Sequence, residues 1–134
     1  MLPAKDAGET LFDAAKSCLA QTFKDFELLL IENDSTPETV EVMNRVAAED
    51  SRVRQISAPA RAGFIAALNL GWQSARGRFL ARMDADDVCH PERIEKQQQL
   101  LLEQPDLSVR HLGANRPKGR GQRTSRANAR VCGL

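Results

Sequence analysis

Residues 26–49, FELLLIENDSTPETVEVMNRVAAE, decide the fold class of this chain. FELLLI is an apolar run that is long enough for a buried strand and too short for a helix. Turn-forming residues follow, and Thr36 and Pro37 are typical of a helix N-cap and of the first helical position. The stretch therefore predicts a buried strand that leads through a polar turn into a helix over residues 37–49.

The alternation of strands and helices continues on both sides of this stretch. Apolar residues within residues 8–21 recur at helical spacing and mark one face of an amphipathic helix. The sequence predicts further helices over residues 62–75 and 91–103, and further strands over residues 53–57 and 78–83. Such alternation favours an α/β fold with a mostly parallel sheet, flanking helices and right-handed crossovers.

Composition limits the possible classes of protein. The chain has 134 residues, of which 42% are hydrophobic, and this is enough for one domain. Neither a membrane-spanning run nor a secretion signal is evident, so we expect a cytoplasmic chain, in solution or at the inner membrane surface. The three cysteines show neither disulfide nor zinc spacing. The glycine-rich motifs of Rossmann dinucleotide-binding proteins, P-loop proteins and serine hydrolases are absent.

Charge divides the chain into two parts. Residues 1–109 contain twelve basic and eighteen acidic residues, a net charge of −6, whereas residues 110–134 contain seven basic residues and no acidic one. The basic part has few large apolar residues, so it cannot bury enough surface to offset its ordering entropy. We expect a folded domain over residues 1–109 and a disordered basic tail over residues 110–134. A nucleic-acid partner is not expected, because no aromatic residues are interleaved with the basic ones.

Polar side chains follow two of the predicted strands. Glu32 and Asn33 come directly after FELLLI. Asp84, Asp86 and Asp87 come directly after RFLARM. Because the carboxyl ends of parallel strands meet at one edge of a sheet, we expect both clusters at that edge. Neighbouring carboxylates repel one another unless a cation intervenes, and oxygen ligands favour Mg²⁺ or Mn²⁺. The alternative is a solvated acidic loop that caps the following helix.

Two long segments carry a resemblance to a known family. Residues 2–39, LPAKDAGETLFDAAKSCLAQTFKDFELLLIENDSTPET, match a pattern of strand end, helix, Q-T-F-x-D-F-E and acidic strand end. Residues 61–97, RAGFIAALNLGWQSARGRFLARMDADDVCHPERIEKQ, match a pattern of R-x-G, N-x-G, A-x-G-x-F-L, D-x-D-D and P-x-R-I-E-x-Q. Together they resemble the family 2 glycosyltransferases, which have the GT-A fold. The resemblance covers residues 2–99 and implies a truncated GT-A domain, the Rossmann-like nucleotide-binding half.

The resemblance also implies roles for matching residues. Asp84 and Asp86 correspond to the DxD pair, in which Asp86 holds the divalent ion, Mg²⁺ or Mn²⁺, on the donor diphosphate. Asp84 contacts the ribose side of the nucleotide and also belongs to the implied metal site. The implied nucleotide-sugar contacts further include Pro3, Ala4, Glu32, Asn33 and Arg61. The implied partner is a nucleotide-diphosphate sugar. The family pattern P-x-Y-N reads Pro3-Ala4-Lys5-Asp6 here, so lysine replaces the aromatic residue.

The implied reaction is the transfer of a sugar from its nucleotide donor to an acceptor hydroxyl. In the family, the catalytic base lies well past the DxD pair, but no residue after Asp106 is acidic here. We therefore assign no catalytic residue and expect a chain that keeps donor and metal binding and is inactive alone. One alternative is an inactive nucleotide-binding remnant. Another is a haloacid-dehalogenase-like phosphatase with Asp84 as nucleophile, although that family places its motif near the start of the domain.

Overall fold

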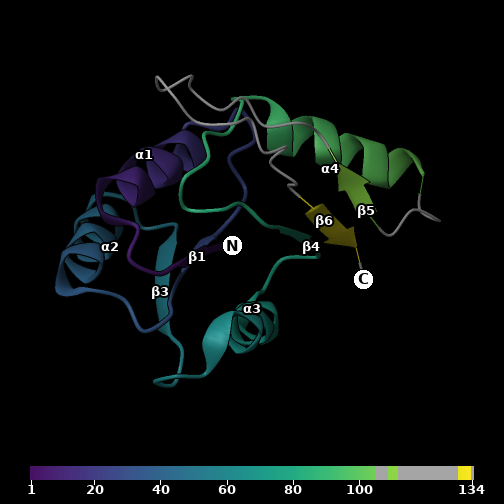
Figure 1. Cartoon of the computed structure of the whole chain (residues 1–134). Coiled ribbons are helices and arrows are strands. Elements are labelled where there is room, and N and C mark those ends of the chain that lie inside the picture. Colours follow the sequence, from purple (N-terminus) through teal and green to yellow (C-terminus); the bar gives the residue numbers. More distant parts are fainter. Residues whose placement is uncertain (105–108, 112–129, 134) are drawn as a thin grey trace, which may run out of the picture.

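A parallel three-stranded sheet lies at the centre of the fold. The computed structural model describes residues 1–104 in full and the backbone of residues 109–111 and 130–133 (Figure 1). The strands of the sheet are β1 (Leu2–Ala4), β2 (Leu28–Glu32) and β3 (Val53–Ser57), in the order β1-β2-β3. Leu2 pairs with Leu30, and Leu28 pairs with Val53. The carboxyl ends of the three strands therefore meet at one edge.

Helices cover both faces of this sheet (Figure 1). They are α1 (Gly8–Leu19), α2 (Pro37–Glu49) and α3 (Gly63–Ser74). Side chains of β2 alternate between the faces, because successive residues of a strand point in opposite directions. Leu28 and Leu30 pack with the core formed by α1 and α2, whereas Ile31 packs with Ala67 of α3. The predicted α/β fold with flanking helices is confirmed, and α2 and β3 have the predicted bounds.

A second sheet contains the strand predicted over residues 78–83. It consists of β4 (Phe79–Ala81), β6 (Arg130–Gly133) and β5 (Val109–His111) in that order, and both pairs are antiparallel. The helix α4 (Arg93–Glu103) follows the acidic loop, which contains Asp84, Asp86 and Asp87. We expected β4 to belong to the parallel sheet. In the structure β4 pairs instead with β6, and Met1 connects the two sheets through hydrogen bonds to Ala81 and Met83.

The predicted basic tail, residues 110–134, lies largely outside the described residues. Within it the structure describes the backbone of residues 110–111 and 130–133, which belong to β5 and β6. The prediction of disorder for the rest of the tail concerns residues outside the described ranges. None of the described helices is long and apolar enough to cross a membrane.

Gly71 allows α3 to lie close against the parallel sheet. A Cβ atom added at this position would lie 2.2 Å from Cδ1 of Ile31 and 3.0 Å from Sδ of Met1. Ile31 is fully buried, so its side chain has little room to move. We expect Gly71→Ala to lower the free energy of unfolding by about 1–3 kcal/mol, the usual effect of overpacking. Urea denaturation measures this, and Asn69→Ala on the exposed side of the same helix should change it by less than about 0.5 kcal/mol.

Asp50 and Arg52 form an ion pair at the entry to β3. Hydrogen bonds from Arg52 lower the pKa of Asp50 from 3.8 to about 2, and those of its side chain contribute more than that of its backbone N–H. A carboxyl group with a lowered pKa stabilises the fold above its unfolded pKa, and this contribution disappears as the pH falls through the folded value. We expect Asp50→Asn to cost about 1 kcal/mol at pH 7, because the pair is partly exposed.

The stability difference between wild type and Asp50→Asn should depend on pH. Urea denaturation at several pH values should show the difference between wild type and Asp50→Asn shrinking from about pH 4 toward pH 2. A difference that stays constant over this interval would contradict the role of the ion pair.

Candidate functional site

A cavity of about 460 Å³ lies at the carboxyl edge of the parallel sheet. Five of the predicted site residues line it, and they come from β1 (Pro3, Ala4), from the residue after β2 (Asn33) and from the loop after β4 (Asp84, Asp86). Its other lining residues, which the sequence did not single out as site residues, are Lys5, Asp6, Ala7, Thr10, Phe64 and Ala85. Residues from the ends of separate strands therefore line one cavity, as the sequence predicted.

Hydrogen bonds fix the β1 side of this cavity to the β2 side. Asp6 has a φ of 49°, which aspartate tolerates better than most residues, and its Oδ1 accepts the Thr36 N–H at 3.0 Å. The carbonyl oxygen of Ala4 accepts the N–H of Asn33 at 3.1 Å and the hydroxyl of Ser35 at 3.0 Å. These hydrogen bonds hold the turn after β1 against the turn after β2 and place Asn33 next to the end of β1.

Two predicted residues do not line the cavity. The half-buried Glu32 turns back into its own loop, where Oε1 accepts the N–H of Ser35 at 2.7 Å. Arg61 is exposed in the turn before α3, where its φ is 59°. The structure thus brings Asn33, rather than Glu32, into one cavity with Asp84 and Asp86.

The three aspartates of the acidic loop have different surroundings. Asp84 is half-buried and forms an ion pair with Arg82, whose guanidinium carbon lies 5.1 Å from the ring centroid of Phe64. Asp86 is exposed, whereas Asp87 is only 5% exposed and donates its backbone N–H to the carbonyl oxygen of Asp84 at 3.2 Å. Asp84 and Asp86 therefore face the cavity, and Asp87 belongs to the interior of the loop.

The donor atoms of the cavity fit one mode of cation binding. Among the described residues no group of three or more His, Cys, Asp or Glu side chains is placed to hold a metal ion. A cage built from protein ligands alone is therefore not present in that part of the chain. Mg²⁺ and similar ions often take one or two carboxylates and complete their coordination with water and substrate phosphates. Asp84 and Asp86 fit this second mode.

Gln21 anchors the acidic loop to α1. It is fully buried, its Nε2 donates to the carbonyl oxygen of His90 at 2.8 Å, and its Oε1 accepts the N–H of Ile94 at 3.0 Å. Ser17 adds a contact, since its Oγ accepts the N–H of Cys89 at 2.9 Å. Sequence reasoning gave Gln21 no role, although it is the Gln of the Q-T-F pattern.

Two thiols meet at the base of this loop. A hydrogen bond with Cys18, together with the guanidinium of Arg93, lowers the pKa of Cys89 against the opposing effect of burial. The same hydrogen bond and burial raise the pKa of Cys18. Cys18 also contacts Met83, with 3.8 Å between the two sulfur atoms. These cysteines are far apart in the sequence, so spacing alone gave no sign of the contact.

Comparisons with known proteins identify the family of the chain. The family model described as glycosyl transferase family 2 matches residues 1–131. The chain belongs to this family. It is 32% identical over 103 residues to an uncharacterised glycosyltransferase of Haemophilus influenzae, an alignment that covers 77% of this chain and 41% of the relative. It is also 36% identical over 89 residues to the putative glycosyltransferase EpsE of Bacillus subtilis, covering 66% of this chain and 32% of EpsE.

Solved structures of glycosyltransferases share the fold. The chain superposes with a TM-score of 0.77 on S. aureus TarS 1–349 in complex with UDP, at 19% identity, covering 93% of this chain and 37% of that one. The mannosyltransferase PcManGT from Pyrobaculum calidifontis, in complex with GDP-Man and Mn²⁺, gives a TM-score of 0.72 at 18% identity. This alignment covers 81% of this chain and 32% of PcManGT. The resemblance and the GT-A fold are confirmed, and the phosphatase alternative gains no support. The chain spans less than half the length of each of these relatives.

Proposed function

We propose that the family 2 chain binds a nucleotide-diphosphate sugar together with Mg²⁺ or Mn²⁺ in the 460 Å³ cavity. The observation that carries the proposal is that Asp84 and Asp86 share this cavity with Asn33 and the end of β1. Membership of the family supports it. So do the ligands of structures with the same fold, namely UDP-GlcNAc in TarS and GDP-Man with Mn²⁺ in PcManGT.

Different polar groups of the cavity would contact different parts of the bound donor. The exposed Asp86 supplies a carboxylate oxygen to the cation, and Asp84 serves the cation or the ribose from its position beside Arg82. Lys5 is exposed at the same cavity and brings positive charge toward the diphosphate. Asn33 offers both a donor and an acceptor to the nucleotide. A bound cation would neutralise charge on the departing diphosphate during sugar transfer.

A catalytic base has no place in this proposal. Sugar transfer uses a general base near the acceptor hydroxyl, and the family resemblance implies a carboxylate in this role. Among the described residues, the carboxylates of the cavity are those of Asp6, Asp84 and Asp86. Asp6 is engaged by the Thr36 N–H, and the other two are assigned to the donor. We infer that this chain binds the donor and does not transfer its sugar by itself.

Titration calorimetry tests both parts of the proposal. UDP, GDP and their common sugar conjugates are titrated into the full chain with Mn²⁺ and again with EDTA, and sugar release is followed in parallel. We expect saturable binding of at least one nucleotide, weakened about tenfold or more by EDTA, with no sugar release. Equal affinity with and without the metal would reject the role of the cation. Sugar release would show that the chain contains a base.

A further inference from the structure

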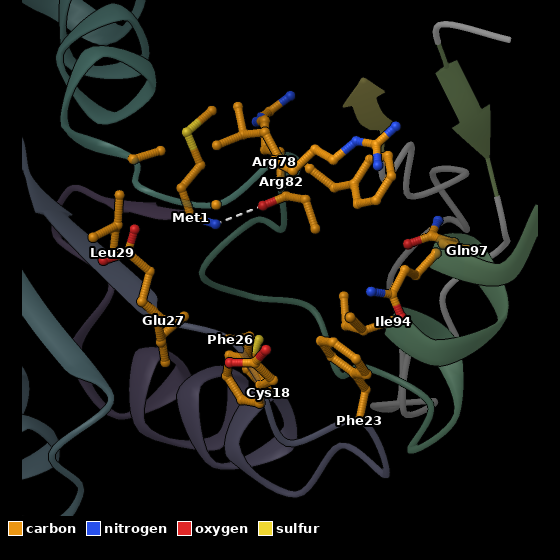
Figure 2. A pocket seen from close by; sticks show the side chains of 18 of the residues that line it. Met1, Cys18, Phe23, Phe26, Glu27, Leu29, Arg78, Arg82, Ile94 and Gln97 are labelled. Atoms are coloured by element: carbon orange, nitrogen blue, oxygen red, sulfur yellow. Dashed lines mark hydrogen bonds between the residues drawn. The ribbon is translucent and has the colours of Figure 1, made fainter. Parts of the chain in front are cut away.

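Arg82 lies next to the proposed donor site without lining its cavity. Its guanidinium forms an ion pair with Asp84, and its guanidinium carbon lies 5.1 Å from the ring centroid of Phe64. Asp84 and Phe64 both line the 460 Å³ cavity. Figure 2 shows Arg82 near Met1, at the edge of a neighbouring cavity. The guanidinium therefore contacts two residues of the donor site from outside it.

The side chain of Arg82 is only partly satisfied in this position. Its Nη2 donates to Oδ1 of Asp84, but its Nε is buried and has no hydrogen-bond partner in the part of the chain that the structure describes. Native proteins pair most buried N–H groups, so a purely structural arginine would be expected to satisfy this one. The main chain is fixed separately, because the carbonyl oxygen of Arg82 accepts Nη2 of Arg93 at 2.9 Å. The contact with Asp84 is therefore not needed to hold the main chain in place.

The charge of Arg82 changes the electrostatic balance at the cavity. The charged residues of the lining are one lysine and three aspartates, with a net charge of −2, namely Lys5, Asp6, Asp84 and Asp86. The adjacent guanidinium of Arg82 reduces the net charge to −1, and a divalent cation would then bring the site to +1. With an uncharged residue at position 82, the same site loaded with a cation would be neutral.

This balance acts in opposite ways on the two ligands of the proposed donor site. A cation that arrives alone has to share Asp84 with the guanidinium and is repelled by its charge, so Arg82 weakens the binding of the free cation. A nucleoside diphosphate is attracted to a site of net positive charge, and guanidinium groups are good partners of phosphate oxygens. Arg82 therefore strengthens the binding of the diphosphate once the cation is present.

We propose that Arg82 is a positioning residue that makes this site favour a cation carried by a nucleoside diphosphate over the free cation. This role rests on the proposed function and goes beyond it by assigning a task to a residue outside the cavity. Arg82 acts through Asp84, because its guanidinium holds this carboxylate at the cavity wall and Phe64 keeps the guanidinium beside it. The site then binds few metal ions until a nucleotide brings one.

Four variants of the full chain test this role. Arg82→Gln and Arg82→Met remove the charge, and the methionine keeps an apolar contact with Phe64. Arg82→Lys keeps the charge. Arg78→Gln is the matched control, because Arg78 also lies over an aromatic ring, 5.2 Å from the centroid of Phe79, but is exposed and outside the lining of the 460 Å³ cavity. Electron paramagnetic resonance measures the binding of Mn²⁺ alone, and calorimetry measures the binding of UDP and GDP at saturating Mn²⁺.

We expect the two neutral variants to shift the two affinities in opposite directions. Mn²⁺ alone should bind to them about threefold more tightly than to wild type, or better, because no guanidinium competes for Asp84. The nucleotide that binds wild type should bind to them about fivefold more weakly, or worse, because the loaded site has lost its positive charge. Arg82→Lys should stay within about twofold of wild type for Mn²⁺ alone, since its charge remains. Arg78→Gln should match wild type in both measurements.

Several results would overturn this role of Arg82. A fall in both affinities would show that Arg82 only holds the loop, and unchanged binding of Mn²⁺ alone would exclude competition with the cation. Urea denaturation shows which variants fold, and Arg82→Met replaces Arg82→Gln if the latter does not. Failure of both neutral variants to fold would give Arg82 a structural role instead. If wild type binds Mn²⁺ but neither nucleotide, the proposed function fails, whereas the Mn²⁺ titrations still decide whether Arg82 competes with the cation.

Discussion

Asp86→Asn is expected to weaken the Mn²⁺-dependent binding of nucleoside diphosphate by about 100-fold, or roughly 2.7 kcal/mol. Asp86 is the exposed one of the two acidic-loop carboxylates that line the cavity, and the described residues contain no cluster of three metal-ligating side chains. With so few protein ligands, each carboxylate carries a large share of the cation affinity. Asparagine keeps the shape and removes the charge.

The control for this prediction is Asp13→Asn, which removes an exposed carboxylate from α1 outside the cavity. Calorimetry with Mn²⁺ should give wild-type affinity for this variant, and urea denaturation should show both variants folded. If Asp86→Asn keeps the full metal-dependent affinity, the acidic loop does not hold the cation. The solvated-loop interpretation of the sequence would then be the better one.

Gln21→Ala is expected to lower the free energy of unfolding by about 3 kcal/mol. The substitution removes the acceptor of the Ile94 N–H and the donor to the His90 carbonyl in one step. Buried backbone groups that lose their partners cost about 1–3 kcal/mol each, and the lost side-chain volume adds to this. The loop that carries Asp84 and Asp86 would also lose its attachment to α1.

Gln73→Ala is the matched comparison, because Gln73 is exposed on α3. Urea denaturation should show a change of less than about 0.5 kcal/mol for this variant. A loss below about 1 kcal/mol for Gln21→Ala would mean that water replaces the amide and that the loop does not depend on it. Nucleotide affinity, measured at a temperature where the variant is folded, should fall if the loop position depends on Gln21.

Short-range patterns predicted most of the fold. The N-cap and proline at the start of α2 and the short apolar run of β2 gave helix and strand in the right places, because each signal acts within a few residues. The sheet that β4 joins depends on a long-range partner. No local pattern shows that β4 pairs with β6, about 50 residues further along the chain.

The candidate site was predictable to the same limited extent. The chain brings Asn33, Asp84 and Asp86 to one cavity, because Ala81 and Met83 are hydrogen-bonded to Met1 and the loop that follows lies beside the end of β1. The sequence pattern does not show which hydrogen-bond partner an individual side chain takes, and this partner decides where the side chain points. Glu32 is placed at the correct strand end, but its carboxylate accepts the N–H of Ser35 and is held in its own loop, away from the cavity.

The position of the Met1 amino group has a practical consequence for handling the protein. Because this nitrogen donates to the carbonyl oxygen of Ala81, residues attached to it would continue β1 between β2 and β4. A purification tag joined directly to Met1 would therefore lie between these strands and change how they pack. Assays should compare preparations with and without residues ahead of Met1.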